Sequence, residues 1–289
     1  MPPPTDRTEI MARLRKQVAE GKAIVGAGAG IGLTAKSVEA GGGDLIVIYN
    51  SGRYRMNGRG SLAGLMPYGN ANDIVLEMAN ETLPLLTTTP LLCGICATDP
   101  TRPLPPFLAQ LRALGIAGIQ NFPTVGLIDG TFRQALEATG MSYAAEISLI
   151  ALAHGMGFLT TPYVFDSLQA KQMAEAGADI VVAHMGLTTG GTIGLGKEGM
   201  GAKTLDECVA LCKEILGAVR GVQGEGAMVI VHGGPVEGAE EAQYVLERVP
   251  GLCGFYGASS VERIPVEKAI RGTVEGLKAV GIRKYEAGA

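Results

Sequence analysis

Eight short apolar segments, most of them separated by a helical pattern, constrain the fold of this chain more than any other feature. Each segment is short enough to be a strand that is buried on both faces of a parallel sheet. Glycine stands between several helical patterns and the next strand, where it commonly ends helices, as in AGAD (176–179). The apolar segments are AIVGAG (23–28), LIVIYN (45–50), LLCGICA (91–97), IAGIQNF (116–122), GFLTTPYV (157–164), DIVVAHMG (179–186), MVIVHGG (228–234) and GFYGASS (254–260).

Eight strands that each precede a helix are the pattern of a (β/α)8 barrel, and a chain of 289 residues fits that length. We therefore predict an α/β protein with a TIM barrel over residues 23–289. Residues 1–22 are predicted to be an N-terminal helical extension, with an extra helix near residues 5–20 that closes the bottom of the barrel. No repeat or low-complexity linker divides the sequence, so we expect a single domain. The expected helices include 72–81, 104–114, 141–155, 166–176, 204–220, 236–248 and 265–280.

The composition favours a large core and disfavours several classes of partner. Hydrophobic residues make up 47% of the chain and charged residues 18%, and the net charge is -4. No basic patch indicates nucleic acid, no apolar run is long enough to span a membrane, and the charged N-terminus is unlike a signal peptide. The five cysteines are an odd number and indicate no disulfide framework. We expect a cytoplasmic protein and, because so apolar a chain exposes patches that mark interfaces, a homo-oligomer.

A glycine-rich segment after the first predicted strand raises the possibility of a dinucleotide cofactor. Glycine occupies every second position from Gly26 to Gly32, and no register of these glycines matches G-x-G-x-x-G. The second strand ends in Tyr49-Asn50, without the acidic residue that would meet a ribose hydroxyl. We therefore expect no NAD. Glycines such as Gly28 instead let the backbone and a ligand approach each other closely at the end of a strand.

In barrels of this kind the chemistry lies at the C-terminal ends of the strands, which sorts the polar residues. A long loop is expected after the second strand, and it carries Arg53 and Arg55. Arginine binds carboxylates and phosphates through two parallel hydrogen bonds, so both residues are candidates for holding an acidic substrate. The alternative is a solvated loop with surface charges.

The next strands bring acids and amides to the same end. Asp99 ends the third strand and is a candidate metal ligand or base, or a simple turn residue before a proline. Gln120 and Asn121 end the fourth strand. Glu146 lies on a helix between the fourth and fifth strands, where it is either an inward-facing acid or metal ligand, or an ordinary helix residue.

Two histidines end neighbouring strands, His184 the sixth and His232 the seventh. Histidine is the side chain best suited to proton transfer near neutral pH, so both are candidates for that role. An anion bound beside His232 is expected to raise the pKa of its imidazole. In the alternative interpretation the ring bonds to the backbone of a neighbouring strand.

The loops after the last two strands are predicted to hold a phosphate or a second anion. Gly233 and Gly234 follow one strand, and Gly257 and Ser259 end the other, in the place where many barrels bind phosphate. Ser259 and Glu262 also have the spacing of a capping box, which accounts for Glu262 without a functional role.

Four segments together resemble the phosphoenolpyruvate hydrolase-like family, over nearly the whole chain: NSGRYRMNGRGSLAGLMPYGNAN, GIQNFPTVGLIDG, ADIVVAHMGLTTGGTIG, and HGGP with GFYGASSVER. That family consists of TIM-barrel proteins related to the phosphoenolpyruvate mutase and isocitrate lyase enzymes, which act on α-keto acids with Mg²⁺. The resemblance implies an enzyme that cleaves a C–P, P–O or C–C bond in a small anionic substrate, an α-keto or phosphorylated acid. It also implies a divalent metal, Mg²⁺, although the third strand end keeps one acid where the related enzymes carry an Asp-x-Asp pair.

The predicted site therefore combines the strand-end residues with the family resemblance. Two alternatives remain: a metal-dependent C–C lyase of aldolase type, and a non-catalytic ligand-binding or regulatory barrel. The latter would work beside a separate ATP-binding partner protein, like the other half of a plant antiviral resistance protein whose C-terminal half is a similar barrel. The candidate residues are Glu146, His184 and His232 as catalytic groups, Asp99 as the metal ligand, and Gly28, Asn50, Arg53, Arg55, Gln120, Asn121, Gly233, Gly234, Gly257 and Ser259 as substrate-binding residues.

Overall fold

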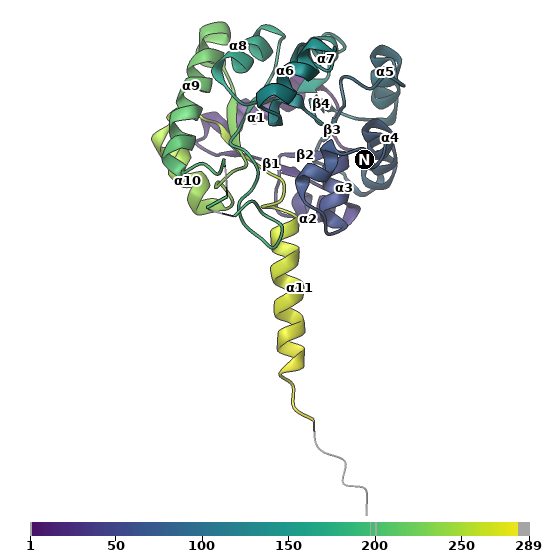
Figure 1. Cartoon of the computed structure of the whole chain (residues 1–289), viewed down its shortest axis with the longest axis vertical. Helices are drawn as coiled ribbons and strands as arrows, with labels where there is room; N and C mark the ends of the chain where they lie inside the picture. The colour runs from purple at the N-terminus through teal and green to yellow at the C-terminus, as the bar shows by residue number, and fades with distance from the viewer. Residues whose placement is uncertain (1, 197, 200, 283–289) are drawn as a thin grey trace, which may run out of the picture.

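The computed structural model describes residues 2–196, 198–199 and 201–282, and they form an α/β barrel (Figure 1). The strands pair in parallel in the order β5-β4-β3-β2-β1-β9-β8-β7-β6. The two ends of this order are pieces of one barrel strand, because Thr161 N donates to Ile119 of β4 and the Pro162 carbonyl accepts from Val182 of β7. The sheet thus closes on itself, and the predicted TIM barrel is confirmed. The strands are β1 Ile24–Gly28, β2 Leu45–Ile48, β3 Leu91–Gly94, β4 Gly118–Gln120, β5 Leu159–Thr160, β6 Tyr163–Val164, β7 Val181–His184, β8 Val229–His232 and β9 Gly254–Gly257.

The helices follow the predicted pattern, with two additions. Where we expected a long loop after the second strand, the structure has α3 and then a 3₁₀ turn, Ser61–Leu65. Between the fourth strand and the helix expected over residues 141–155, it has α6. Both helices are short, with seven and nine residues, so neither has a long apolar period that would predict it from the sequence. The helices are α1 Arg7–Ala19, α2 Gly32–Ala40, α3 Asn50–Met56, α4 Ala71–Thr82, α5 Leu104–Leu114, α6 Gly130–Ala138, α7 Tyr143–Gly155, α8 Ser167–Glu175, α9 Leu205–Gln223, α10 Ala239–Arg248 and α11 Arg263–Lys278.

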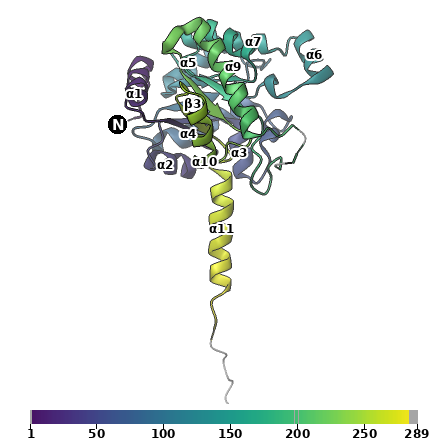
Figure 2. The same ribbon diagram turned by 90° about the vertical axis from the view of Figure 1, so that its left-hand side faces the viewer.

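The strands are buried on both faces, which is why they appear in the sequence as continuous apolar runs. All four residues of β2 are fully buried. The predicted extra helix is α1, which buries Ile10, Met11 and Leu14 in the same core. Arg7 of α1 donates to Asp179, just before β7, so α1 lies at the N-terminal end of the strands. Figure 2 shows α1 and α6 on opposite sides of the body.

The last helix departs from the barrel. Ile264 in the first turn of α11 is buried, but the rest of the helix projects from the body as a single rod (Figures 1 and 2). Ile270 and Leu277 are 61% and 66% exposed. The last barrel helix therefore does not pack on the outer wall of its own barrel.

Among the described residues, no helix combines the length and the apolar character needed to cross a membrane.

Candidate functional site

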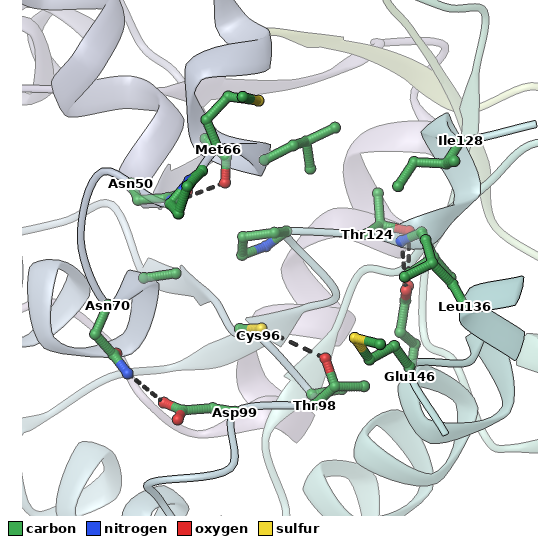
Figure 3. Close-up of a pocket in the computed structure, with 18 of the residues that line it drawn as sticks. Asn50, Met66, Asn70, Cys96, Thr98, Asp99, Thr124, Ile128, Leu136 and Glu146 are labelled. Carbon is green, nitrogen blue, oxygen red and sulfur yellow. Dashed lines mark hydrogen bonds between the residues drawn. The ribbon is translucent and has the colours of Figure 1, made fainter. Parts of the chain in front are cut away.

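Predicted site residues line two of the hollows at the C-terminal ends of the strands, the end at which we predicted the chemistry. The large cavity has a volume of about 370 Å³ and lies beyond the ends of β2, β3 and β4, with Asn50, Asp99 and Glu146 in its wall (Figure 3). The small pocket has a volume of about 30 Å³ and lies nearer the barrel axis. Its lining includes Arg55, His184, His232 and Ser259. Seven of the predicted site residues are thus divided between two neighbouring spaces, and the others line neither of them.

Glu146 is a buried acidic residue in the wall of the large cavity. It lies in the first turn of α7, where Ser142 caps the helix by accepting from Ala145 N. Its Oε2 accepts from Asn121 Nδ2 at 2.6 Å and from Thr124 Oγ1 at 2.7 Å, and its Oε1 accepts from Val125 N at 2.8 Å. Burial outweighs these hydrogen bonds and raises the pKa of Glu146 to about 7. A carboxyl group with this pKa exchanges a proton near neutral pH, as a general acid or base must.

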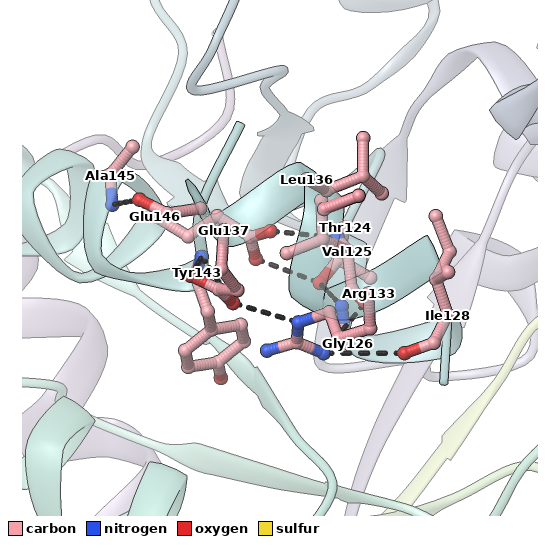
Figure 4. Close-up of polar contacts among 12 residues, drawn as sticks. Thr124, Val125, Gly126, Ile128, Arg133, Leu136, Glu137, Tyr143, Ala145 and Glu146 are labelled. Carbon is pink, nitrogen blue, oxygen red and sulfur yellow. Dashed lines mark hydrogen bonds and ion pairs between the residues drawn. The ribbon is translucent and has the colours of Figure 1, made fainter. Parts of the chain in front are cut away.

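Arg133 of α6 fixes the segment around Val125, which lines the large cavity beside Glu146 (Figure 4). Its Nη1 donates to the carbonyl oxygen of Val125 at 2.7 Å, and its Nε donates to Glu137 Oε1 at 2.7 Å. The same Glu137 oxygen accepts from Tyr143 N at the start of α7. The segment after β4 is therefore tied to the helix that carries Glu146.

Asp99 borders the large cavity, but its carboxylate is already surrounded by donors. Oδ2 accepts from the side-chain amides of Asn70 and Asn72, both at 3.0 Å, and Oδ1 accepts from Thr101 N at 2.9 Å and Thr101 Oγ1 at 2.7 Å. Burial acts to raise the pKa of Asp99, but these hydrogen bonds prevail and lower it below its ordinary value. Asp99 is therefore an ionised group that holds the loop after β3 to the start of α4.

The surroundings of Asp99 do not fit the metal expected there. Mg²⁺ is bound by carboxylate and carbonyl oxygens and by water in an octahedron. Asn70 and Asn72 instead turn N–H groups toward the carboxylate, and the amide oxygen of Asn72 accepts from Cys96 N. In the part of the chain that the structure describes, no three His, Cys, Asp or Glu side chains are grouped to hold a metal.

The two histidines meet in the small pocket, with ring centroids 4.6 Å apart. Gly186 N donates to His184 Nδ1, so this nitrogen carries no proton, and burial together with His232 holds the pKa of His184 well below its ordinary value. His232 Nδ1 lies 2.6 Å from the carbonyl oxygen of Tyr256, to which it donates. Burial lowers the pKa of His232 to about 4. Burial thus favours the neutral ring, which bonds to the neighbouring strand as in the alternative interpretation, while the pKa raised by a bound anion stays a prediction.

Arg55 reaches the small pocket, whereas Arg53 does not. Arg55 is buried, and its Nε donates to Glu262 Oε1 at 2.6 Å. Arg53 points to the outside of α3 and pairs with Glu77 at 2.7 Å and with Glu81 at 3.1 Å. Arg53 therefore lines neither hollow, and the expectation that it holds a substrate carboxylate is corrected.

The glycines after β1 have a packing role in this structure. A Cβ at Gly30 would lie 2.0 Å from the carbonyl oxygen of Gly52, and one at Gly28 would lie 3.2 Å from Arg55 Nη2. Gly30 N also donates to Glu262 Oε2 at 2.6 Å. The glycines thus allow α3 and the Arg55–Glu262 pair to approach the end of β1.

The remaining predicted residues lie behind the hollows. Gln120 donates to the carbonyl oxygen of Thr161 and Asn121 holds Glu146, both from buried positions. Gly233 and Gly234 adopt φ values of 78° and 60° and pack on the turn after β7, while α10 begins only at Ala239, not near Pro235 as expected. Gly257 packs against Val261. None of these five residues lines the large cavity or the small pocket. Of the residues expected to bind an anion after β8 and β9, only Ser259 lines the small pocket.

Sequence reasoning missed several residues of the site. Glu262 was explained as part of a capping box, but its side chain accepts from Arg55 and Gly30 and makes no helix-capping bond. Tyr49 and Tyr163 line the small pocket, and Cys96 lines the large cavity. Tyr49 and Cys96 follow strands directly, so a wider use of the strand-end rule would have included them. The partner of Glu262 lies 207 residues away, and no local pattern indicates it.

Comparisons with known proteins agree with this architecture. The family model described as phosphoenolpyruvate hydrolase-like matches residues 9–280. The ToMV resistance protein Tm-1 of Solanum lycopersicum is 56% identical over 276 residues, which cover 96% of this chain and 36% of that protein. The chain therefore spans about a third of the length of that relative.

Two solved structures show the same fold at low identity. One is 2,3-dimethylmalate lyase, a member of the PEP mutase/isocitrate lyase superfamily, with a TM-score of 0.57, 13% identity, and coverage of 96% of this chain and 90% of that one. The other is phosphonopyruvate hydrolase in complex with oxalate and Mg²⁺, with a TM-score of 0.55, 17% identity, and coverage of 93% and 87%. The structural neighbours thus include a lyase and a hydrolase.

Proposed function

The chain belongs to the phosphoenolpyruvate hydrolase-like family, and on that premise we propose that it is an enzyme that cleaves a C–C, C–P or P–O bond in a small organic acid. The observation that carries this proposal is Glu146, a buried carboxyl group in the wall of the large cavity with a pKa of about 7. A general acid or base works best when its pKa lies near the operating pH, so this carboxyl group is suited to move protons during such a cleavage. The lyase and the hydrolase that share the fold support this reaction class.

The proton transfers can be assigned to Glu146. In the cleavage of a 2-hydroxy acid, the ionised carboxylate takes the hydroxyl proton. The C2–C3 bond breaks as the carbonyl forms on C2, and C3 keeps the electron pair as an enolate, so the substrate of this step must carry a second carboxylate or carbonyl group on C3. Protonated Glu146 then returns the proton to that carbon. Asn121 and Thr124 act as positioning residues, because their hydrogen bonds hold one carboxylate oxygen in place.

No step of this mechanism passes through a metal. The resemblance implied Mg²⁺, but the donors around Asp99 do not fit such an ion. The two histidines are neutral rings in the small pocket and donate no proton from a charged form near neutral pH. We expect the same rate with EDTA as with added Mg²⁺.

The test is a substrate panel followed by NMR. Phosphonopyruvate, 2,3-dimethylmalate and simple 2-oxo and 2-hydroxy acids are incubated with the protein between pH 5 and pH 9. We expect cleavage of at least one acid, with a rate that responds to an ionisation near pH 7. Glu146→Gln should lower the rate by roughly 10²-fold or more, whereas Glu175→Gln, an exposed control on α8, should not. Wild-type turnover in a folded Glu146→Gln protein would remove Glu146 from the mechanism, and an inert panel would favour the non-catalytic barrel.

We also propose that the chain forms a homo-oligomer through α11, with a second copy of the chain as the partner. The helix places Val266, Ile270, Val274 and Leu277 on one side, at helical spacing, and the last three are more than half exposed. It contains two glycines, which lower its intrinsic helix propensity, and most helical stability in proteins comes from packing of an apolar face, so we expect a partner to cover this face. Val25, in β1, is 41% exposed on the outer wall that α11 leaves open. Exchange of α11 between two copies would cover both surfaces. The separate ATP-binding partner protein stays a prediction.

A further inference from the structure

The small pocket contains a buried hydroxyl group without a hydrogen-bond partner. Tyr163 of β6 is 1% exposed and lines this pocket, and its Oη has no partner in the part of the chain that the structure describes. Burial raises the pKa of Tyr163 well above its ordinary value, so the hydroxyl group keeps its proton. A buried donor that stays unpaired costs free energy, so this hydroxyl group indicates a ligand atom that accepts from it.

His184 places a second donor beside the first. The rings of Tyr163 and His184 meet edge to face, with centroids 4.9 Å apart. Because Gly186 N donates to His184 Nδ1, the proton of this neutral ring lies on Nε2. His232 has the reverse arrangement, because its Nδ1 donates to Tyr256 and leaves an acceptor at Nε2. Tyr163 and His184 therefore offer two donors to one oxygen atom.

Most of the other polar side chains of the small pocket already have partners. Arg55 pairs with Glu262, which offsets its charge. The hydroxyl oxygens of Ser61 and Ser259 lie 3.2 Å apart, and Ser51 donates to the carbonyl oxygen of Ser61. No unpaired cation belongs to the described lining of this pocket. A carboxylate would therefore lose its hydration there without meeting an opposite charge.

The rest of the small pocket is apolar and leaves little room. Phe122, Leu127, Leu187 and Ala258 line it together with the two donors. Its volume of about 30 Å³ admits about two water-sized groups. An acetyl group matches this combination, because its oxygen meets the donors and its methyl group meets the hydrocarbon. A carboxylate would instead place its second oxygen against the apolar side chains.

The small pocket lies beside the group that we propose to transfer protons. Phe122 lines the small pocket, and the next residue, Pro123, lines the large cavity. Asn121 Oδ1 accepts from Tyr163 N at 2.7 Å, and Asn121 Nδ2 donates to Glu146 Oε2 at 2.6 Å. One buried amide thus holds both Glu146 and the strand that carries the unpaired hydroxyl group.

We propose that the small pocket binds a neutral carbonyl group on C3 of the substrate, which is a 2-hydroxy-4-oxo acid and not a dicarboxylic acid. This inference rests on the proposed function, because the bond that breaks is the C2–C3 bond and Glu146 takes the proton of the C2 hydroxyl group. The electron pair of that bond forms the enolate, whose oxygen accepts from Tyr163 Oη and His184 Nε2. Glu146 then returns the proton to C3, so 2-hydroxy-4-oxopentanoate gives glyoxylate and acetone.

Neutral donors suit this step. They are in place before the reaction, so they stabilise the charge that develops on the enolate oxygen without reorganisation. The enolate is charged only while Glu146 is protonated, so the total charge of the site does not change. A dicarboxylic acid would add a further negative charge in the small pocket, where it finds no unpaired cation among the described residues.

The first experiment measures binding of unreactive analogues to the whole chain by isothermal titration calorimetry. Levulinate and succinate both lack the C2 hydroxyl group, and they differ only in the group meant for the small pocket, acetyl in one and carboxylate in the other. We expect levulinate to bind about tenfold more tightly, because a carboxylate costs more to bury than a carbonyl group. Tyr163→Phe should weaken levulinate binding about threefold to tenfold and leave succinate binding unchanged. Equal affinities of the two acids, or tighter binding of succinate, would overturn the inference.

Tyr54→Phe is a matched control. Tyr54 also has a buried hydroxyl oxygen without a partner among the described residues, but it lines neither the large cavity nor the small pocket. The control should alter neither affinity. Because the hydroxyl group of Tyr163 is unpaired without a ligand, Tyr163→Phe should not lower the free energy of unfolding, which urea unfolding checks. Equal losses for both acids in Tyr163→Phe would show that this hydroxyl group does not select a carbonyl group.

Turnover distinguishes this inference from the proposed function. NMR should show 2-hydroxy-4-oxopentanoate cleaved about tenfold or more faster than malate, and Tyr163→Phe should lower kcat roughly 10²-fold with a smaller effect on KM. If levulinate is preferred as expected but the wild-type protein cleaves no acid, the carbonyl site stands and the enzymatic proposal fails. If acids are cleaved at rates that require Glu146 while malate reacts at least as fast, the reaction stands and the carbonyl site is rejected.

Discussion

Glu262 accepts a hydrogen bond from Arg55 Nε at 2.6 Å, across 207 positions of the sequence. The two side chains are 0% and 2% exposed. Burial opposes the charge on Arg55, but the attraction of Glu262 outweighs it and raises the pKa of Arg55 above its ordinary value. The other oxygen of Glu262 accepts from Gly30 N. One ion pair therefore joins the end of β1, α3 and the start of α11 beside the small pocket.

Removing one partner of the Arg55–Glu262 pair should lower the free energy of unfolding. Arg55→Met leaves the Glu262 carboxylate buried and unpaired, so we expect the free energy of unfolding to fall by about 3–5 kcal/mol. The double variant Arg55→Met with Glu262→Leu should recover most of that loss. Urea unfolding measures both, with Arg248→Met on the exposed face of α10 as a control that costs about 1 kcal/mol or less. A loss as small as the control's would show that water reaches the pair.

Glu146 should make stability depend on pH in a direction that is unusual for a carboxyl group. Burial raises its pKa from 4.5 to about 7, so between these values the folded protein binds more protons than the unfolded chain. Its contribution to the free energy of unfolding is then fully present below pH 4.5 and is lost as the pH rises through about 7, a change of about 3 kcal/mol. Glu146→Gln removes this dependence. Urea unfolding of both proteins at several pH values tests it, and parallel curves would contradict a raised pKa.

His232 should make the free energy of unfolding depend on pH in the opposite direction. Burial lowers its pKa from 6.5 to about 4, so in that interval the unfolded chain binds the extra proton. Its contribution to stability is full above pH 6.5 and is lost as the pH falls toward 4. His232→Gln should therefore lose less stability than the wild-type protein on acidification. Proton NMR of the imidazole offers a second measurement: a midpoint near 6.5 would show that the ring is charged at mildly acidic pH, contrary to this structure.

The exposed face of α11 predicts self-association. Ile270→Glu combined with Leu277→Glu adds charge to the apolar side of the helix, so the mass measured by light scattering should fall toward that of one 29.9 kDa chain. Lys268→Glu, which faces the other side of the same helix, should leave the mass unchanged. A wild-type protein with the mass of a single chain would show that α11 has no partner of its own kind.

The sequence by itself determined the barrel and the end at which the chemistry lies. Continuous apolar runs such as Leu45–Ile48 require burial on both faces, and helices between them require parallel strands. The apolar runs and the helical segments between them are local patterns, so the sequence shows them without a structure. The same strand-end rule brought Asp99, Arg55, the two histidines and Ser259 to the correct end, and a helix pattern identified the segment that carries Glu146.

Only the tertiary structure decided what these residues meet. Arg53 and Arg55 are two positions apart on α3, roughly 200° around the helix axis, so one faces Glu77 and Glu81 on α4 and the other faces Glu262. Their sequence neighbourhoods do not distinguish them, because each partner comes from a distant segment. Likewise, the pKa of Glu146 depends on how deeply Asn121, Thr124 and the wall of the large cavity bury it. Burial and charge pairing are sums over neighbours in space, and only the folded chain specifies those neighbours.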